Sequence, residues 1–269
     1  MPNAPNAYDI NYAYYRAIAP GMDEYWRKMA APQMRISTLL RLLAERPPLS
    51  LVDLGCGNGY LLSQLCARHP TTEFAGIDLS DTQLAVNRRQ LPGIAFYEMD
   101  LCQPRLRLPP RLVQHFDAVV AAEIIEHVED PLRFLSNARS LATSRGGRLL
   151  LTTQSGPLRE TERRVGHVRH FTIEEMHSLL TKAGWEPLCI WNCGFPFHDL
   201  SKWYANLDPD ASMRSFGEQR YGLWQNLICS ALRLAFRFNS KRRGAQLFAV
   251  AHICKDRPQP LEEGHTPSS

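Results

Sequence analysis

The sequence lacks the features of a secreted or membrane-spanning protein. Its first residues have neither the basic start nor the apolar segment of a signal peptide. No run approaches the roughly 20 apolar residues that a membrane-spanning helix needs. The seven cysteines are odd in number and form no C-x-x-C pair, so we expect reduced thiols and no structural zinc site. Together these absences predict a cytoplasmic protein.

Strong charge of one sign is also missing. The formal net charge is +4, and the arginines that carry it are scattered along the chain without a dense basic block. This distribution argues against a nucleic-acid partner, and no RNA-binding motif is present. The 269 residues include 44% hydrophobic and 22% charged residues and no internal repeat, which is typical of one globular domain with elaborations. Nothing in the sequence indicates the oligomeric state.

What is present is a regular alternation of short apolar runs and helical patterns. Ser80 and Thr172 occupy N-cap positions, and Gly184 occupies a C-cap position, which supports the helix boundaries. The alternation predicts an α/β fold with a doubly wound, mostly parallel sheet covered by helices on both faces. Strands are predicted at 49–55, 72–79, 94–100, 116–122, 147–153, 186–195 and 246–255, and helices at 35–45, 60–69, 81–91, 131–142 and 172–185.

The pattern divides the chain into four parts. Residues 1–48 are expected to form an N-terminal helical extension, and residues 49–195 with 246–255 the core. The segment 196–245 is too long for an ordinary connection between neighbouring strands, so it is predicted to be a helical cap inserted before the last strand. The polar, proline-rich residues 256–269 are predicted to be a disordered tail.

A glycine-rich turn follows the first predicted strand. In VDLGCGNGY, Gly55, Gly57 and Gly59 permit a sharp turn and let a ligand approach the N–H groups at the helix start. Asp78 ends the next strand about 20 residues later, where a carboxylate can accept both hydroxyls of a ribose. Asp100 ends the third strand. Together these residues predict a site for a nucleotide-type cofactor; for the glycines alone, a plain tight turn is the alternative.

These motifs resemble those of the class I S-adenosylmethionine-dependent methyltransferases. The segments DLGCGNG, GIDLS, MD, FDAVVAAEIIEHV and GGRLLLTT occur in the family's order. The resemblance implies a Rossmann-like sheet of seven strands, the last antiparallel, and S-adenosyl-L-methionine as the cofactor. Asp53 would help to hold the methionine end and Asp78 the ribose, while Met99 and Asp100 would meet the adenine. The expected cofactor residues are Asp53, Gly55, Gly57, Gly59, Asp78, Leu79, Met99, Asp100 and Ala121.

Four acids and a histidine crowd the segment EIIEHVEDP, which follows a predicted buried strand. In an open parallel sheet the ligand lies beyond the carboxyl ends of the strands, so this segment should face the cofactor. A helix from Ile124 onward would place Glu123, Glu126 and His127 on one stripe. Two carboxylates and an imidazole suit a divalent metal, and the absence of a nearby thiolate favours Mg²⁺ or Mn²⁺ over zinc.

Two later histidines, His167 and His170, should return to the same edge after the fifth strand. The arrangement is similar to that of the O-methyltransferases of ubiquinone biosynthesis, and more distantly to small-RNA 3′-end 2′-O-methyltransferases. Both have a Glu-x-x-Glu-His element and a later histidine. His167, by its position after a glycine, matches the quinone family better than His170. The expected metal ligands are Glu123, Glu126, His127, His167 and His170.

Three roles stay open for these side chains. A metal would lower the pKa of an acceptor hydroxyl and orient its oxygen toward the methyl group. Without a metal, His127 or His167 would act as a general base aligned by a glutamate. The structural alternative is that acids are favoured near a helix N-terminus and the histidine has no role. The candidate catalytic residues are His127, Glu126 and His167.

The cap contains an amphipathic helical pattern. In LWQNLICSALRLAFRFNSKRRG, apolar residues such as Trp224 and Leu227 accompany Arg233, Arg237 and Lys241, which are spaced by four. Packing of the apolar side on the domain is the first interpretation. Contact with a membrane surface or a lipid substrate is the second, and nucleic acid the third.

The sequence therefore predicts methyl transfer to a hydroxyl of a small-molecule acceptor, such as a quinone, a phenol or a secondary metabolite. One alternative is 2′-O-methylation of RNA, against which the mild charge stands. Another is a methyltransferase-like scaffold that binds the cofactor without turnover, against which the intact acids and histidines stand. The choice of acceptor depends on the N-terminal helices and the cap, where no specific motif is recognised.

Overall fold

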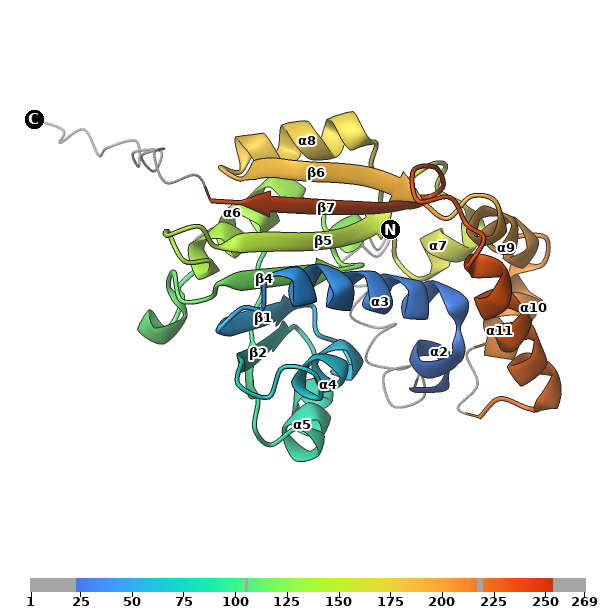
Figure 1. Ribbon diagram of the computed structural model, residues 1–269, viewed down its shortest axis with the longest axis horizontal. Helices are drawn as coiled ribbons and strands as arrows, with labels where there is room; N and C mark the ends of the chain where they lie inside the picture. The colour runs from blue at the N-terminus through green and yellow to red at the C-terminus, as the bar shows by residue number, and fades with distance from the viewer. Residues whose placement is uncertain (1–22, 105, 217–219, 254–269) are drawn as a thin grey trace, which may run out of the picture.

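The protein is described here by a computed structural model covering residues 23–104, 106–216 and 220–253. Its strands are β1 (Ser50–Leu54), β2 (Glu73–Asp78), β3 (Ala95–Glu98), β4 (Ala118–Ala122), β5 (Arg148–Gln154), β6 (Glu186–Cys193) and β7 (Gln246–His252). They form one sheet in the order β3-β2-β1-β4-β5-β7-β6 (Figure 1). The strand β7 runs antiparallel to both of its neighbours, β5 and β6, and all other pairs are parallel. The predicted mostly parallel, seven-stranded sheet with an antiparallel last strand is confirmed.

Helices connect the strands at the predicted places. The Ser80 hydroxyl accepts a hydrogen bond from the backbone N–H of Gln83, and Thr172 and Glu175 form a reciprocal capping box. Gly184 has a positive φ of 83° just after its helix. The helices are α2 (Asp23–Lys28), α3 (Ala30–Glu45), α4 (Tyr60–Cys66), α5 (Asp81–Gln90), α6 (Pro131–Leu141), α7 (Glu160–Arg164), α8 (Ile173–Lys182), α9 (Phe197–Ala205), α10 (Pro209–Phe216) and α11 (Leu223–Phe236), with 3-10 turns η1 (Pro110–Leu112) and η2 (Ile125–His127).

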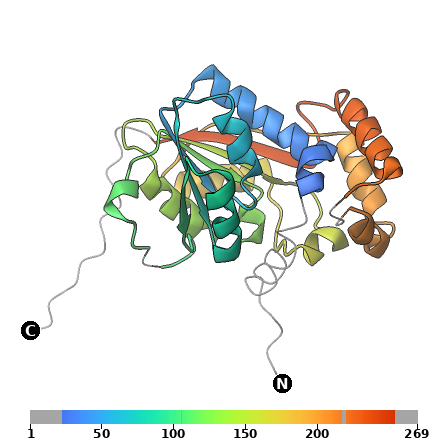
Figure 2. The same cartoon turned by 90° about the horizontal axis from the view of Figure 1, so that it is seen from below.

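Both faces of the sheet are buried beneath helices (Figure 2). Alternate residues of a strand point to opposite faces, so Ala118 and Val120 pack with α3, α4 and α5, while Val119 and Ala121 pack with α6 and α8. Burial on both faces explains why the central strands are continuous apolar runs rather than alternating ones. The carboxyl ends of the parallel strands are left as the one edge where polar side chains can gather.

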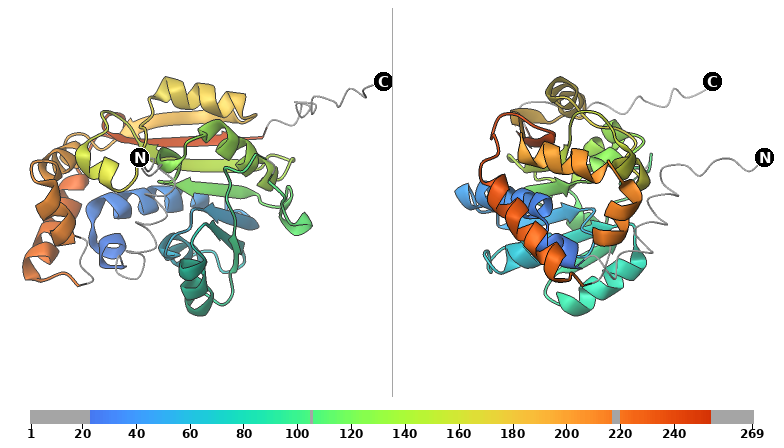
Figure 3. Two further views of the ribbon diagram at one scale, coloured as in Figure 1. Left: turned by 180° about the vertical axis from the view of Figure 1, so that it is seen from behind. Right: turned by 90° about the vertical axis from the view of Figure 1, so that its right-hand side faces the viewer.

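The helices α9, α10 and α11 lie together at that end of the molecule (Figures 1 and 3). They come from the segment 196–245 that the sequence assigns to a cap. The first 22 residues and the predicted tail at 256–269 lie outside the described residues. Within the described ranges, no helix combines the length and the apolar character needed to cross a bilayer.

Candidate active site

The glycine turn between β1 and α4 depends on left-handed backbone. Gly55, Gly57 and Gly59 have φ angles of 67°, 48° and 70°, which side chains other than glycine rarely adopt. A Cβ on Gly55 would lie 2.4 Å from the Cδ1 atom of Ile124, whereas a Cβ on Gly57 would meet open space. The turn is therefore packed against the chain at Gly55 and open to a ligand at Gly57.

Asp78 lies directly beside this turn. Its carboxylate accepts hydrogen bonds from the backbone N–H groups of Gly57, at 2.8 Å, and Ser80, at 2.9 Å. Burial raises the pKa of Asp78, and these N–H groups oppose the shift. Burial and the charge of Asp78 also raise the pKa of Asp53 in β1 to about 8. Two neighbouring buried acids form a place where a cationic group is stabilising.

The other expected cofactor residues lie along the same edge. Met99 donates its backbone N–H to the carbonyl of Asp78 at 3.1 Å, and Met99 and Asp100 line a cavity of about 510 Å³. Leu79 follows Asp78 directly, and Ala121 is buried opposite Leu54 near the end of β4. The structure thus places these residues at the carboxyl ends of β1 to β4.

The four acids of EIIEHVEDP have four different environments. Glu123 has a left-handed φ of 54°, and the chain then makes only the short turn η2. The expected helical stripe of Glu123, Glu126 and His127 does not form, because this backbone turns the Glu123 side chain toward β5 and β7. Asp130 caps α6 by accepting from the N–H of Arg133, and Glu129 is exposed. The structural interpretation therefore holds for Asp130, and the buried acids are Glu123 and Glu126.

Glu123 is the centre of a buried polar network. Its carboxylate accepts hydrogen bonds from the side chains of Thr152, at 2.9 Å, Gln154, at 2.5 Å, and Gln246, at 2.8 Å. A guanidinium nitrogen of Arg35 lies 3.6 Å away. Burial would raise the pKa of Glu123, but Arg35 and the three hydrogen bonds hold it below its usual range. Glu123 is therefore a charged structural anchor at neutral pH.

The network extends into the cap through Lys202 of α9. Its ammonium group donates to the side-chain oxygen of Gln154 at 2.9 Å and lies 3.1 Å from Glu162 of α7. Sequence reasoning missed Arg35 and Lys202. For Arg35 a signal exists, because it shares one helical stripe with the fully buried Leu39 and Leu43. A charged residue on the apolar stripe of a helix indicates a buried partner.

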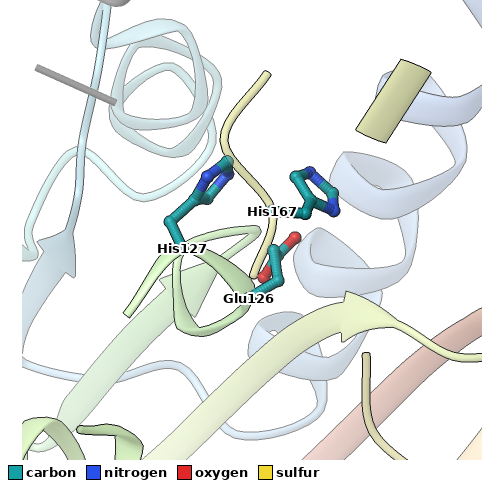
Figure 4. A group of neighbouring side chains, drawn as sticks. All are labelled: Glu126, His127 and His167. Carbon is teal, nitrogen blue, oxygen red and sulfur yellow. The ribbon is translucent and has the colours of Figure 1, made fainter. Parts of the chain in front are cut away.

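Glu126, His127 and His167 converge beyond the end of β4 (Figure 4). One ligand atom from each lies within 4.8 Å of the others. Glu126 is fully buried; its Oε2 atom accepts from the Thr153 hydroxyl at 2.7 Å, but its Oε1 atom has no partner. The N–H of Val168 donates to the Glu126 carbonyl at 2.9 Å, which fixes the loop of His167 against η2.

Hydrogen bonds determine which nitrogen of His167 is available. Burial lowers the pKa of His127 to about 4 and that of His167 to about 2, and it lowers the pKa of His170, so all three are neutral at pH 7. The carbonyl of Gly156 can only accept, so the Nδ1 atom of His170, 3.1 Å away, carries its proton. The Nε2 atom of His170 then accepts from Nδ1 of His167 at 3.2 Å. This leaves a lone pair on Nε2 of His167.

Three of the five expected ligands therefore meet, and two do not. Glu123 belongs to the polar network with Arg35, and His170 lies behind His167 with both ring nitrogens engaged. Sequence spacing could not separate these cases, since the backbone turn at Glu123 and the placement of His170 behind His167 are properties of the folded chain.

The sequence model of one protein family, described as a methyltransferase domain, matches residues 25–190. The chain belongs to this methyltransferase family. The glycine turn and the strand-end acids all lie within the matched residues.

Individual relatives agree with this assignment. The chain is 29% identical to a ubiquinone biosynthesis O-methyltransferase of Ruegeria pomeroyi, over 63% of this chain and 73% of the relative. It is 43% identical to a trans-aconitate 2-methyltransferase of Methylobacterium nodulans, but only over 27% of this chain and 29% of that protein's length. An N-methyltransferase of Bradyrhizobium japonicum, solved with S-adenosyl-l-homocysteine, has the same fold, with a TM-score of 0.57 at 18% identity over 91% of this chain and 99% of that one.

Proposed function

We propose that this methyltransferase methylates a hydroxyl oxygen of a small-molecule acceptor, assisted by a divalent metal held by Glu126, His127 and His167. The orphaned Oε1 atom of Glu126 carries the proposal. A buried carboxylate oxygen without a hydrogen-bond donor is costly unless a proton or a cation meets it. Two neutral imidazoles beside it supply further donor atoms.

The donor set fits a transition metal ion. Metals bind carboxylates and neutral imidazoles, and the low pKa values of His127 and His167 keep both rings in that form. One ring N–H of His127 bonds the Gly166 backbone and that of His167 bonds His170, as is usual behind metal ligands. With one oxygen and two nitrogens, the set favours Mn²⁺ over Mg²⁺.

The charge balance of the two buried glutamates also supports a cation. Burial and the charge of Glu123 raise the pKa of Glu126 well above its usual range. This shift favours the protonated form of Glu126 in the free protein, and a bound metal would replace that proton. Glu123 pairs with Arg35 and would keep its structural role beside the site without binding the metal.

The reaction needs the acceptor oxygen to be deprotonated and to lie in line with the methyl–sulfur bond of the donor. A bound metal would lower the pKa of the acceptor hydroxyl. As the oxygen–carbon bond forms, the bond between the methyl carbon and sulfur breaks, and its electron pair stays on sulfur. With the metal bound, both ring nitrogens of His127 would be engaged, so the hydroxyl proton would pass to solvent; without a metal, the lone pair of neutral His127 would accept it. Asp53, Asp78 and the glycine turn would hold the methyl donor in line.

The relatives support oxygen as the acceptor atom. The names of the Ruegeria relative and of a malonyl-[acyl-carrier protein] O-methyltransferase of Halalkalibacterium halodurans both specify O-methylation; the second is 26% identical over 51% of this chain. Among such acceptors we favour catechols and vicinal diols, since two neighbouring oxygens can bind one metal.

Calorimetric titration of Mn²⁺, then Mg²⁺, into chelator-stripped protein saturated with S-adenosylhomocysteine tests the metal site. We expect binding that Glu126→Gln weakens by at least about 100-fold, because loss of a direct ligand should cost no less than loss of an outer-shell partner. Glu129→Gln is the matched control, because Glu129 is an exposed acid three residues away. Absence of Mn²⁺ binding in the unaltered protein would refute the metal site and leave His127 as a metal-free base.

A further inference from the structure

The cap exposes an unusual amount of apolar surface. Large apolar side chains exposed in the described residues are concentrated between 195 and 238, on α9, on α11 and in the segments beside them. Trp203 and Tyr204 of α9 are 50% and 72% exposed, and Trp224 of α11 is 78% exposed. Scattered exposed apolar residues are normal, but a concentrated patch marks an interaction surface.

The helix α11 is apolar on two sides, of which only one is covered. Cys229 is buried, and Phe236 makes an edge contact with the ring of His198 at 5.8 Å between centroids. The opposite side of the helix, together with Phe238 just after its end, forms an exposed stripe. We call it the cap stripe: Trp224, Leu227, Ile228, Leu234 and Phe238. Packing on the domain therefore accounts for one side of the helix and leaves the cap stripe without a partner among the described residues.

Basic residues continue the cap stripe at its C-terminal end. Between residues 221 and 246 the sequence contains no acid. The five basic residues of this stretch are all exposed: Arg233, Arg237, Lys241, Arg242 and Arg243. Two acids elsewhere in the cap are already engaged: Asp199 of α9 accepts the backbone N–H of Ala245 at 2.9 Å, and Asp210 of α10 pairs with Arg164. Apolar and aromatic side chains beside exposed cations match the two layers of an anionic lipid surface.

We propose that the cap stripe and its five basic residues dock the enzyme on the surface of an anionic lipid bilayer. The apolar side chains would enter the interface and the arginines and lysines would meet the head groups. A second copy of the chain suits this surface less well, because a two-fold contact would bring the five cations close to their own counterparts.

The proposed surface adjoins the active site. One side of α9 directs Lys202 to Gln154 in the polar network around Glu123, and the other exposes Trp203 and Tyr204. The right-hand view of Figure 3 faces this end, with α9, α10 and α11 lying across it. Docking would hold the acceptor side of the enzyme close to the bilayer. The proposal does not depend on the acceptor or on the metal.

Sedimentation with vesicles tests the docking without any methyl transfer. The full chain is mixed with vesicles of three parts phosphatidylcholine to one part phosphatidylglycerol at about 0.1 M salt. We expect binding that is much weaker on pure phosphatidylcholine. The triple variant Trp224→Ser/Leu227→Gln/Ile228→Ser should lose at least about tenfold in affinity. Arg233→Gln/Arg237→Gln should lose about 25-fold, or about fivefold for each charge.

The control variant is Leu132→Gln/Leu188→Gln, which changes two exposed apolar residues on α6 and β6, outside the cap. It should bind vesicles as the unaltered chain does, and all variants should keep their affinity for S-adenosylhomocysteine, which shows that they fold. The proposal is overturned if the unaltered chain does not bind the anionic vesicles, or if the triple variant binds them equally well. It is also overturned if ultracentrifugation shows a dimer that the triple variant dissolves, without vesicle binding.

Discussion

The two halves of the proposed active site are built in different ways. The proposed cofactor side comprises the glycine turn and the acids at the ends of β1, β2 and β3. Its central hydrogen bond joins Gly57 and Asp78, which are 21 residues apart. The acceptor side comprises Glu123, Glu126, the two cluster histidines and the network around Glu123. There Gln246 and Glu123 are 123 residues apart, and Arg35 and Gln246 are 211 apart.

The difference separates a local construction from a global one. The cofactor side uses backbone N–H groups of the turn between β1 and α4 and acids from three consecutive strands, so its geometry follows from neighbouring sequence. The acceptor side assembles side chains from α3, β5, α7, α9, β7 and the segment after β4 that contains η2, and so depends on how the extension and the cap pack on the core. Binding of the methyl donor and choice of acceptor should therefore be separable by mutation.

The largest expected effect is that variants on one side lose methyl transfer while variants on the other lose cofactor binding. Glu126→Gln should reduce methyl transfer by about 10³-fold, about 4 kcal/mol, because the proposed metal loses its carboxylate. Asp78→Asn should instead weaken S-adenosylhomocysteine binding by about 100-fold, since charged hydrogen bonds are lost. Transfer of labelled methyl groups into the small molecules of a cell extract, beside calorimetry, measures both. Equal loss of cofactor affinity in the two variants would abolish the comparison.

The buried ion pair of the acceptor side should contribute strongly to stability. Arg35→Met leaves Glu123 without its cation and should lower the free energy of unfolding by about 3 kcal/mol. Arg41→Met, at an exposed position of the same helix α3, should change it by less than about 0.5 kcal/mol. Urea unfolding followed by circular dichroism measures both. Similar stability of the two variants would show that Arg35 does not hold the network together.

Cofactor affinity should depend on pH through Asp53. Its pKa of about 8 means that the free protein holds this proton at neutral pH. An ammonium group bound nearby would favour the carboxylate, so binding releases the proton and affinity rises with pH. We expect an increase of up to about tenfold between pH 6.5 and 7.5 in S-adenosylhomocysteine titrations. Asp53→Asn should flatten the curve; a flat curve for the unaltered protein would place the ammonium group elsewhere.

Two glycine variants test whether the glycine turn contacts the acceptor side through Gly55 and Ile124. Gly57→Ala strains a left-handed position without a clash and should weaken cofactor binding by about fivefold, roughly 1 kcal/mol. Gly55→Ala has the same strain and also displaces Ile124, two residues before Glu126, so it should impair transfer as well. The rate at saturating cofactor distinguishes the two. An unchanged rate in Gly55→Ala would mean that Ile124 moves without disturbing Glu126.

Much of the fold was predictable, because its signals are local. The apolar runs, the caps at Ser80 and Thr172 and the glycine turn each act over a few residues, and the structure has the strands and helices that they predict. Glu126 and His127 could be proposed because they are adjacent at a strand end. His167 needed the resemblance to a family, since nothing in its own sequence neighbourhood distinguishes it from His170.

By itself, the sequence determined the parallel sheet, the glycine turn with its strand-end acids, and the position of the acid-rich segment after β4, since periodicity and turn chemistry are short-range properties. Only the tertiary structure decided that Glu123 pairs with Arg35 while Glu126 meets two histidines. It also decided which side of α11 is buried. These outcomes depend on which side chains share a buried volume, and burial sets both the cost of an unpaired charge and the direction of each pKa shift.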